Sequence, residues 1–270
     1  MDTASPQRIA PVLRMEQVAV GALQDPATVL VEDVNWTVEP GDYWVLAGLQ
    51  GSGKSDFLMM AASLMAPVRG DYWLFGEPMP IFDEARLKTR LRVGLVFDGG
   101  QLFNHLTVRE NIALPLRYHR NVGKLEAEQE AQPWLEALEL APWADTTPGA
   151  IGRNWQKRVG LARALILQPE VLLIDNPLGG LDLRHSNWWL DFLDQLAKGH
   201  PRLQNRPMTL IVSAANLQPW RGRARQFAVL HERRFSVLGT WPQLESAGAA
   251  LLRELLPEEA APVKEQKTSR

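Results

Sequence analysis

The eight residues Gly48-Leu49-Gln50-Gly51-Ser52-Gly53-Lys54-Ser55 match the pattern G-x-x-x-x-G-K-[ST] in full. They follow the apolar run 43–47 and precede a helical pattern that starts at Lys54. Glycines let a backbone wrap phosphate groups with its N–H groups turned inward, and the start of a helix adds positive potential. In such a loop the lysine reaches the outer phosphates and the serine hydroxyl binds Mg²⁺. The stretch therefore predicts a phosphate-binding loop between a strand and a helix.

A phosphate-binding site of this kind also needs an acid at the end of an apolar strand. The run Val171-Leu172-Leu173-Ile174-Asp175 provides one. Asp175 would bind Mg²⁺ directly or through water. A strand-ending aspartate is common in ordinary turns as well, but this one accompanies a complete phosphate loop. Together the two elements predict a chain that binds ATP with Mg²⁺.

Outside these elements, short apolar runs alternate with longer helical patterns, which is typical of an α/β sheet protein. Thr107 and Glu110 form a capping-box pattern at the start of one predicted helix. The predicted strands are 12–20, 30–38, 43–47, 70–75, 92–97, 171–174 and 209–212, with a hairpin at 227–238. The predicted helices are 54–65, 125–140, 155–167, 184–197 and 244–256, and the region 103–144 is expected to be mostly helical.

The chain reads as one domain. No linker rich in proline and serine divides it, so residues 12–256 are expected to form a single nucleotide-binding domain with a helical insertion at about 103–165. Residues 1–11 are polar, contain two prolines and lack the apolar core of a signal peptide, and we expect them to be flexible. Residues 257–270 are charged and poor in apolar side chains, which predicts a disordered tail.

The amino-acid composition limits which classes of partner and metal site are expected. Of 270 residues, 46% are hydrophobic and 22% charged, and the formal net charge is −2, without the basic excess that is usual in nucleic-acid binders. We therefore predict no nucleic-acid partner. The chain has no cysteine, which rules out disulfides and thiolate metal sites. No stretch approaches the roughly 18 apolar residues of a membrane span, so any work at a membrane would need a partner.

Further motifs resemble the ABC-type ATPases, the nucleotide-binding subunits of ABC transporters, over residues 15 to about 244. The motifs are Val96-Phe97-Asp98, the stretch 102–112, the stretch 157–165 and Leu178-Gly179-Gly180-Leu181-Asp182. The resemblance implies a P-loop NTPase fold of the α/β class. Its parts would be a RecA-like sheet, an N-terminal antiparallel β-subdomain and a helical subdomain. The segment Leu114-Pro115-Leu116-Arg117 is weakly similar to the ATPases of lipid-trafficking importers.

The resemblance also implies partners and a location. Such subunits work as head-to-tail dimers in which each nucleotide lies between one phosphate loop and the signature helix of the second ATP-binding subunit, homologous or identical. Integral membrane permease subunits dock on the groove near the glutamine loop. The chain would then be cytoplasmic and peripheral on the inner face of the cell membrane. Asp182 and the signature would lie at the dimer interface.

Several positions depart from the family pattern. The family places a glutamate directly after the strand-ending aspartate as the general base, and Asn176 stands there. An amide holds a water but cannot take its proton, and losing a general base typically costs roughly 10²- to 10⁴-fold in rate. The switch histidine position holds Ala214, whose methyl group cannot orient a water. These two replacements remove catalytic groups and leave the phosphate loop whole.

The glutamine and signature positions depart as well. Asp98 aligns with the loop glutamine; it can still bind Mg²⁺ but adds negative charge beside phosphates, and Gln101 is an alternative if the loop is remodelled. The signature Leu-Ser-Gly-Gly-Gln aligns with Ile151-Gly152-Arg153-Asn154-Trp155. Glycines at that helix start let the backbone approach a phosphate closely. Arg153 would either clamp a phosphate or exclude it by its bulk, and Trp155 is bulky too.

Aromatic residues give a weaker signal. No ring is found in the early segment 18–22 to stack on adenine, and Trp36 is better explained by strand packing. Trp188-Trp189 falls in a predicted helix, either as core packing or as a docking face.

Three functions remain open from the sequence. The first is an ATP-binding subunit of an ABC transporter complex with weak or lost hydrolysis, which gates or supports a permease. The second is an ordinary active ABC ATPase that energises transport, which the intact Lys54, Ser55, Asp175 and Asp182 favour. The third is a non-transport ABC protein that acts on ribosomes or DNA. Those proteins usually carry paired cassettes or basic surfaces, which this sequence lacks.

Overall fold

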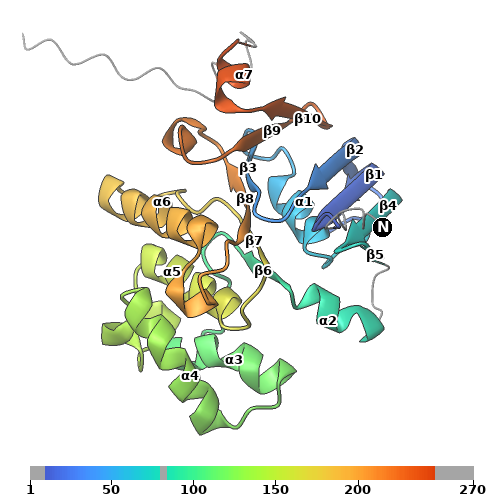
Figure 1. Cartoon of the computed structure of the whole chain (residues 1–270). Coiled ribbons are helices and arrows are strands. Elements are labelled where there is room, and N and C mark those ends of the chain that lie inside the picture. The colour runs from blue at the N-terminus through green and yellow to red at the C-terminus, as the bar shows by residue number, and fades with distance from the viewer. Residues whose placement is uncertain (1–9, 80–83, 247–270) are drawn as a thin grey trace, which may run out of the picture.

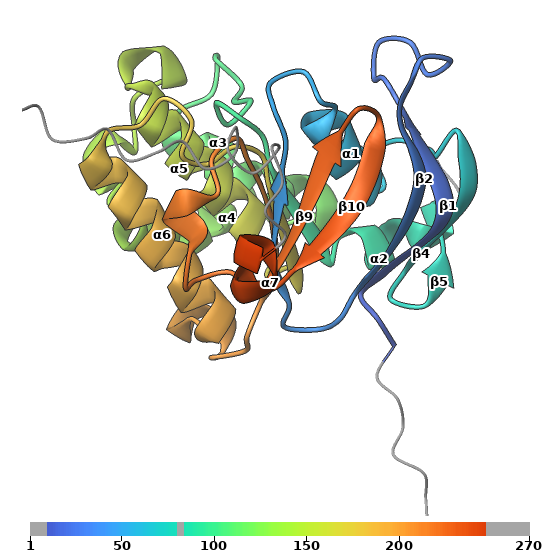
Figure 2. The ribbon, with the colours of Figure 1, turned by 90° about the horizontal axis from the view of Figure 1, so that it is seen from above.

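The strands form one sheet with a parallel and an antiparallel part. The protein is described from a computed structural model, over residues 10–79 and 84–246. In this part of the chain ten strands lie in the order β5-β4-β1-β2-β10-β9-β3-β8-β7-β6. The neighbours β9-β3-β8-β7-β6 are parallel, whereas β5-β4-β1-β2 are antiparallel. Strand β10 joins the two parts, antiparallel to β9 and parallel to β2 (Figures 1 and 2).

The strands are β1 (Leu13–Gly21), β2 (Val29–Val38), β3 (Tyr43–Ala47), β4 (Arg69–Leu74), β5 (Glu77–Pro78), β6 (Val93–Val96), β7 (Val171–Ile174), β8 (Thr209–Ala214), β9 (Gln226–His231) and β10 (Arg234–Gly239). The helices are α1 (Lys54–Ala61), α2 (Leu87–Arg90), α3 (Val108–His119), α4 (Lys124–Ala137), α5 (Arg153–Leu165), α6 (Leu183–Lys198) and α7 (Trp241–Ser246). Short 3₁₀ turns accompany them: Glu84–Arg86, Ala141–Trp143, Pro148–Ala150, Pro201–Leu203 and Gln218–Trp220.

The two faces of the parallel strands belong to two hydrophobic cores, because successive side chains of a strand point to opposite faces. On β3, Tyr43 and Val45 enter the core shared with α3, α4, α5 and α6. Trp44 and Leu46 enter the second core, which is shared with α1 and the antiparallel strands. Helix α1 therefore lies between the two parts of the sheet (Figure 2).

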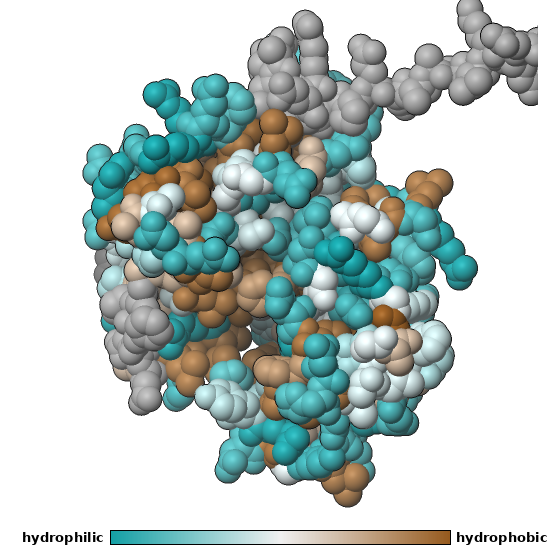
Figure 3. Space-filling view, turned by 180° about the vertical axis from the view of Figure 1, so that it is seen from behind, coloured by the Kyte–Doolittle hydropathy of each residue, from teal (hydrophilic) through white to brown (hydrophobic). Residues whose placement is uncertain are grey.

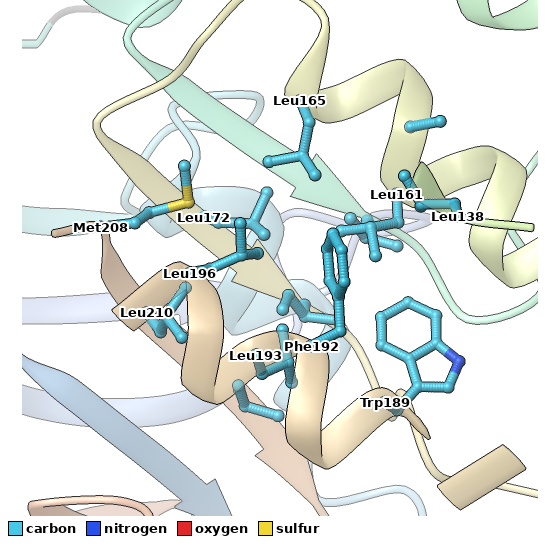
Figure 4. Close-up of a cluster of buried hydrophobic side chains, with 14 of the residues drawn as sticks. Leu138, Leu161, Leu165, Leu172, Trp189, Phe192, Leu193, Leu196, Met208 and Leu210 are labelled. Carbon is cyan, nitrogen blue, oxygen red and sulfur yellow. The ribbon is translucent and has the colours of Figure 1, made fainter. Parts of the chain in front are cut away.

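Helix α6 covers the parallel strands next to α5. In Figure 4, Phe192, Leu193 and Leu196 of α6 face Leu172 of β7 and Leu210 of β8. The figure also shows the fully buried Trp189 in this cluster. The ring of Trp188 stacks on that of Phe192 with their centroids 5.1 Å apart. The packing interpretation of the tryptophan pair therefore holds for Trp189.

Most predicted elements are confirmed, including the hairpin and the runs 43–47 and 171–174. The capping box is present: Thr107 Oγ1 accepts a hydrogen bond from Glu110 N, and Thr107 N donates to the Glu110 carboxylate. Hydrogen bonds from Lys124 and from Thr107 N lower the pKa of Glu110 to about 2.

Some predicted bounds were wrong. The helix expected over 54–65 ends at Ala61, because the chain turns at Ser63 with a left-handed φ of 60°. Helix α7 begins at Trp241, ahead of the expected 244, and residues 247–256 lie outside the described part. Of the N-terminal segment expected to be flexible, 1–11, residues 1–9 lie outside it as well, and so does the tail expected to be disordered at 257–270. Strand β5 and helix α2 were not predicted.

Helix α5 touches the loop after β6 at a point where only glycine fits. A Cβ atom on Gly160 would lie 2.8 Å from the Cα of Gly100. That loop carries Asp98, so the contact sets how closely α5 approaches the predicted site.

We predict that Gly160→Ala is destabilising, because the added methyl group forces the helix and the loop apart, at a cost of about 1–3 kcal/mol. Gly149→Ala is the matched control, because a Cβ there meets no atom within 4 Å. Thermal unfolding of both variants measures the difference. Equal stability of the two variants would contradict the close contact.

Candidate functional site

The phosphate loop connects β3 to α1. Gly53 precedes the helix with a left-handed φ of 86°, which glycine adopts without strain. Gly48 cannot carry a side chain either, since a Cβ there would lie 2.5 Å from Ser52 Oγ and 2.8 Å from Leu230 O. The predicted strand-loop-helix arrangement is therefore present.

Lys54 lies folded into the loop. Its Nζ donates to Gly48 O at 2.6 Å and to Leu49 O at 2.7 Å, and lies 3.4 Å from Ser52 Oγ. Burial lowers the pKa of Lys54, and the nearby charge of Asp175 opposes that shift. The ammonium group is thus held by backbone carbonyls, at the position where a phosphate would compete for its protons.

Asp175 joins three elements at the carboxyl ends of the parallel strands. Its Oδ2 accepts a hydrogen bond of 2.6 Å from Ser55 Oγ of α1. Its Oδ1 accepts another of 2.6 Å from Ser213 Oγ of β8, a fully buried side chain. Ser213 was not recognised as a site residue from the sequence, although a serine in an apolar strand was a possible signal. The predicted pair Ser55 and Asp175 is brought together.

The donor set fits Mg²⁺. Serine hydroxyl and carboxylate oxygens are hard ligands, and proteins usually bind Mg²⁺ through one or two carboxylates together with phosphate oxygens. Within residues 10–79 and 84–246, no cluster of three or more His, Cys, Asp or Glu side chains forms a metal cage of its own. Ser55 and Asp175 would thus hold Mg²⁺ together with a nucleotide.

A cavity of about 440 Å³ lies in front of this centre. It brings together the predicted residues Gln50, Gly51, Gly53, Lys54, Ser55, Asp98, Asp175 and Asn176, with Leu30, Asp56 and Ala215. Ala214 instead lines a neighbouring groove of about 720 Å³ next to Asn176. Gln101 lines neither space; its carbonyl accepts a hydrogen bond from Arg163. The cavity is therefore lined by the phosphate loop, by the proposed Mg²⁺ ligands Ser55 and Asp175, and by Asp98 and Asn176, which depart from the family pattern.

Asn176 adopts a left-handed backbone with a φ of 46°, which asparagine tolerates better than most residues. Its N–H donates to Ser213 Oγ at 2.9 Å. Its side-chain amide lies 3.5 Å from Asp98 Oδ2. The position of the expected general base is therefore occupied by a neutral amide next to a carboxylate.

Asp98 is surrounded by positive charge. Its Oδ1 lies 3.0 Å from the Nζ of Lys157, and its Oδ2 lies 3.7 Å from the guanidinium of Arg153. Lys157 begins the family motif at 157–165, but the sequence did not predict it to belong to the site. The sequence held no signal for this pair, since the two residues belong to separate motifs.

The signature positions lie at the start of α5, and none of them lines the cavity. Gly152 precedes the helix, Ile151 is buried, and Asn154 Nδ2 lies 2.9 Å from His185 Nε2. The ring of Trp155 contacts that of Trp143 at a centroid distance of 6.3 Å. The ring of Trp155 therefore packs in part against residues of its own chain.

Arg153 is largely exposed and reaches back to Asp98 of its own chain. Asp182 accepts a hydrogen bond from His185 N and so caps α6, with most of its side chain in solvent. Among the predicted interface residues, these two therefore present charge at the surface.

The site has no aromatic wall for a base in the described residues that line it. Leu30 is the large apolar residue of the cavity. Trp36 is buried against Trp44, Phe57 and Phe235, which confirms strand packing.

Comparison with known proteins places the fold and site in a family. The family model described as ABC transporter matches residues 31–179, which contain the phosphate loop, Asp98, the signature positions and Asp175. The chain is an ABC transporter ATP-binding domain.

The domain is 32% identical over 213 residues to a spermidine/putrescine import ATP-binding protein of Trichodesmium erythraeum, covering 78% of this chain and 52% of that protein. It is 37% identical over 155 residues to a sulfate/thiosulfate import ATP-binding protein of Gloeobacter violaceus, covering 57% and 43%. It thus spans about half the length of these relatives. In fold, it superposes with a TM-score of 0.72 on the ATP-binding cassette MJ0796, solved as a dimer with ADP and phosphate. That match has 24% identity and covers 82% of this chain and 95% of that one.

We predict that Ser213→Ala destabilises the domain by about 1–3 kcal/mol, because Asp175 Oδ1 and the Asn176 N–H both lose their hydrogen bond to the Ser213 hydroxyl. Ser236→Ala, at an exposed position of β10, is the control. Thermal unfolding measures the effect. A loss no larger than that of the control would contradict the role of Ser213 in holding Asp175.

Proposed function

We propose that this domain is the ATP-binding subunit of an ABC importer in which ATP hydrolysis is weak or lost. The relatives named above are import ATP-binding proteins, which supports the first half. The observation that carries the second half is the amide of Asn176 next to a charge-paired Asp98.

The residues proposed to bind ATP and Mg²⁺ are all present in this domain. Lys54 would exchange its bonds to the loop carbonyls for bonds to the β and γ phosphates, which are charge-assisted and stronger. Ser55 and Asp175 supply the oxygen ligands for Mg²⁺, and Ser213 keeps the carboxylate oriented. ATP and Mg²⁺ are therefore the proposed cofactors.

The hydrolytic half lacks its proton acceptor. Asn176 cannot accept a proton from water, and Ala214 offers only a methyl group beside it. Asp98 is a carboxylate in the same cavity, but it is paired with Lys157 and Arg153, and the position of the general base is that of Asn176. Because these residues act as one unit, their losses do not add independently.

The proposed membrane partner would dock on a groove between α2 and α3. It is lined by the exposed Leu64 and Leu87 together with Pro115 and His119, and encloses about 440 Å³. Figure 3 shows hydrophobic residues around a hollow on the back of the molecule. Within residues 10–79 and 84–246 every helix falls short of the length and apolar character of a membrane span. We therefore infer a peripheral subunit on the inner face of the membrane, held by permease subunits.

A second ATP-binding subunit is the other proposed partner. The exposed Leu183 borders the groove next to Asn176, and the exposed Asp182 directly precedes it in the chain. The structural neighbour MJ0796 is itself solved as a dimer. The transported substrate is not part of this proposal, and the weak similarity to lipid-trafficking importers stays a prediction.

We predict that Lys54→Ala weakens binding of ATP with Mg²⁺ by about 10- to 100-fold, since it removes a charge-assisted bond to phosphate. Lys198→Ala, an exposed lysine of α6, is the control. Titration calorimetry gives the affinity, and phosphate release is measured on the same samples. Phosphate release above background that disappears in Lys54→Ala would show an active ATPase. If the wild-type domain does not bind ATP, the proposed binding of nucleotide by the phosphate loop is wrong.

A restoration series tests the lost base. Asn176→Glu with Ala214→His returns the family residues, but the new carboxylate lies beside that of Asp98, and like charges disfavour a second ionised group. We therefore expect phosphate release to stay near background in this double variant and to rise when Asp98→Asn is added. Ala214→His alone is the control. A double variant as active as the triple variant would contradict the influence of Asp98; a triple variant at background would assign the limit to residues 151–155.

A further inference from the structure

The most enclosed charge near the site belongs to Lys157, in the second turn of α5. Its side chain is only 2% exposed. Its Nζ donates to Asn176 O at 2.7 Å and to Gly179 O at 2.9 Å, with Pro177 O at 3.4 Å. An ammonium group has three protons, so it can fasten several carbonyls of the loop after β7 at once.

The charge of Lys157 is balanced by Asp98 at 3.0 Å. Burial lowers the pKa of Lys157, and its contact with Asp98 opposes that shift. A buried ion that loses its partner is strongly destabilising, whereas a pair replaced by neutral groups of similar volume often costs little. The two residues therefore depend on each other.

The same loop is fastened to α5 at two further points. Gly100 contacts Gly160, and Arg163 donates to Gly100 O at 2.7 Å and to Gln101 O at 2.9 Å. Lys157, Gly160 and Arg163 follow one another at intervals of three residues, which places them on one side of the helix. One face of α5 thus holds residues 98–101, and through Lys157 it also holds residues 176–179.

We propose that Lys157 is a positioning residue of the nucleotide site. It keeps Asp98 off the Mg²⁺ and cancels its charge toward the phosphates, and it joins the loops after β6 and β7 to α5 as one unit. The nucleotide part of this inference rests on the proposed function; the mutual dependence of the pair does not.

A double-mutant cycle tests the proposal with Asp98→Asn, Lys157→Met and both together. We expect each single variant to lower the unfolding temperature of the nucleotide-free domain by about 4–10 °C, and the double variant to lose clearly less than the sum of the two single losses. The exposed pair Glu32 and Arg233 is the matched control: Glu32→Gln with Arg233→Met should shift the unfolding temperature by less than about 4 °C.

Affinity for ATP distinguishes positioning from mere stability, when it is measured well below the unfolding temperatures. Lys157→Met leaves Asp98 with only the exposed Arg153 as a positive neighbour and should weaken binding about fivefold, whereas Asp98→Asn leaves the charge of Lys157 unbalanced and should strengthen it by a similar factor. The double variant should return toward the wild-type value. In Asp98→Asn the ratio of the affinities with Mg²⁺ and with a chelator should stay unchanged, because Lys157 already holds Asp98 away from the metal in the wild-type domain.

Three outcomes would overturn the inference: additive losses of stability, a parallel loss of affinity in both single variants, or a smaller effect of Mg²⁺ in Asp98→Asn. If a single variant does not fold, the double variant decides, since a folded double variant supports the pair and an unfolded one refutes it. A wild-type domain that binds no ATP would refute the proposed function and the positioning role. The stability cycle without nucleotide would then still test the pair.

Discussion

Two hydroxyl groups that converge on one carboxylate hold the centre of this domain. Ser55 Oγ and Ser213 Oγ each donate to Asp175 at 2.6 Å, so that α1, β7 and β8 meet at a single charged group. This arrangement is possible because the parallel strands end at the same edge of the sheet, where their following loops share one space. The phosphate loop, the neighbouring asparagine and the cavity in front of them all take their positions from this contact. A displaced Asp175 would therefore disturb both the metal ligands and the backbone of Asn176.

Around this centre the charged groups match the proposed function, in which the site holds phosphate but does not take a proton from water. The groups that grip a nucleotide are whole, whereas the groups that would activate water are an amide and a methyl group. The carboxylate of Asp98 is balanced by Lys157, which is itself bound to three carbonyls of the loop after β7. Departures that read as separate losses in the sequence are therefore parts of one charge-balanced network. In the proposed function, this network balances the charge of Asp98 next to a bound nucleotide.

The α/β class, most strand positions and the capping box at Thr107 were predictable, because they depend on local periodicity and on interactions within a few residues. The grouping of Lys54, Ser55 and Asp175 followed from motif chemistry. The bounds of helices were less predictable where a residue adopts a backbone conformation that is rare for its type. Ser63, with its positive φ, is such a residue after the end of α1. Lys157 and Ser213 were missed, because a lysine in a helix and a serine in a strand are ordinary until their partners are known. The division into a helical insertion and a surrounding domain stays a prediction, as does the state of the chain ends.

What the sequence by itself determined is the grip: a loop whose glycines, lysine and serine are contiguous, followed by an acid at the end of an apolar strand. Residues that are adjacent in the sequence are held close together by the chain itself, so a motif made of them can be recognised from the sequence alone. Only the tertiary structure decided which groups contact each charged side chain of the site. Ser213 reaches Asp175 across 38 positions and Ser55 reaches it across 120, and Lys157 meets Asp98 because Gly160 lets α5 approach the loop. Such contacts arise from packing between distant segments, and the pattern along the chain does not encode them separately.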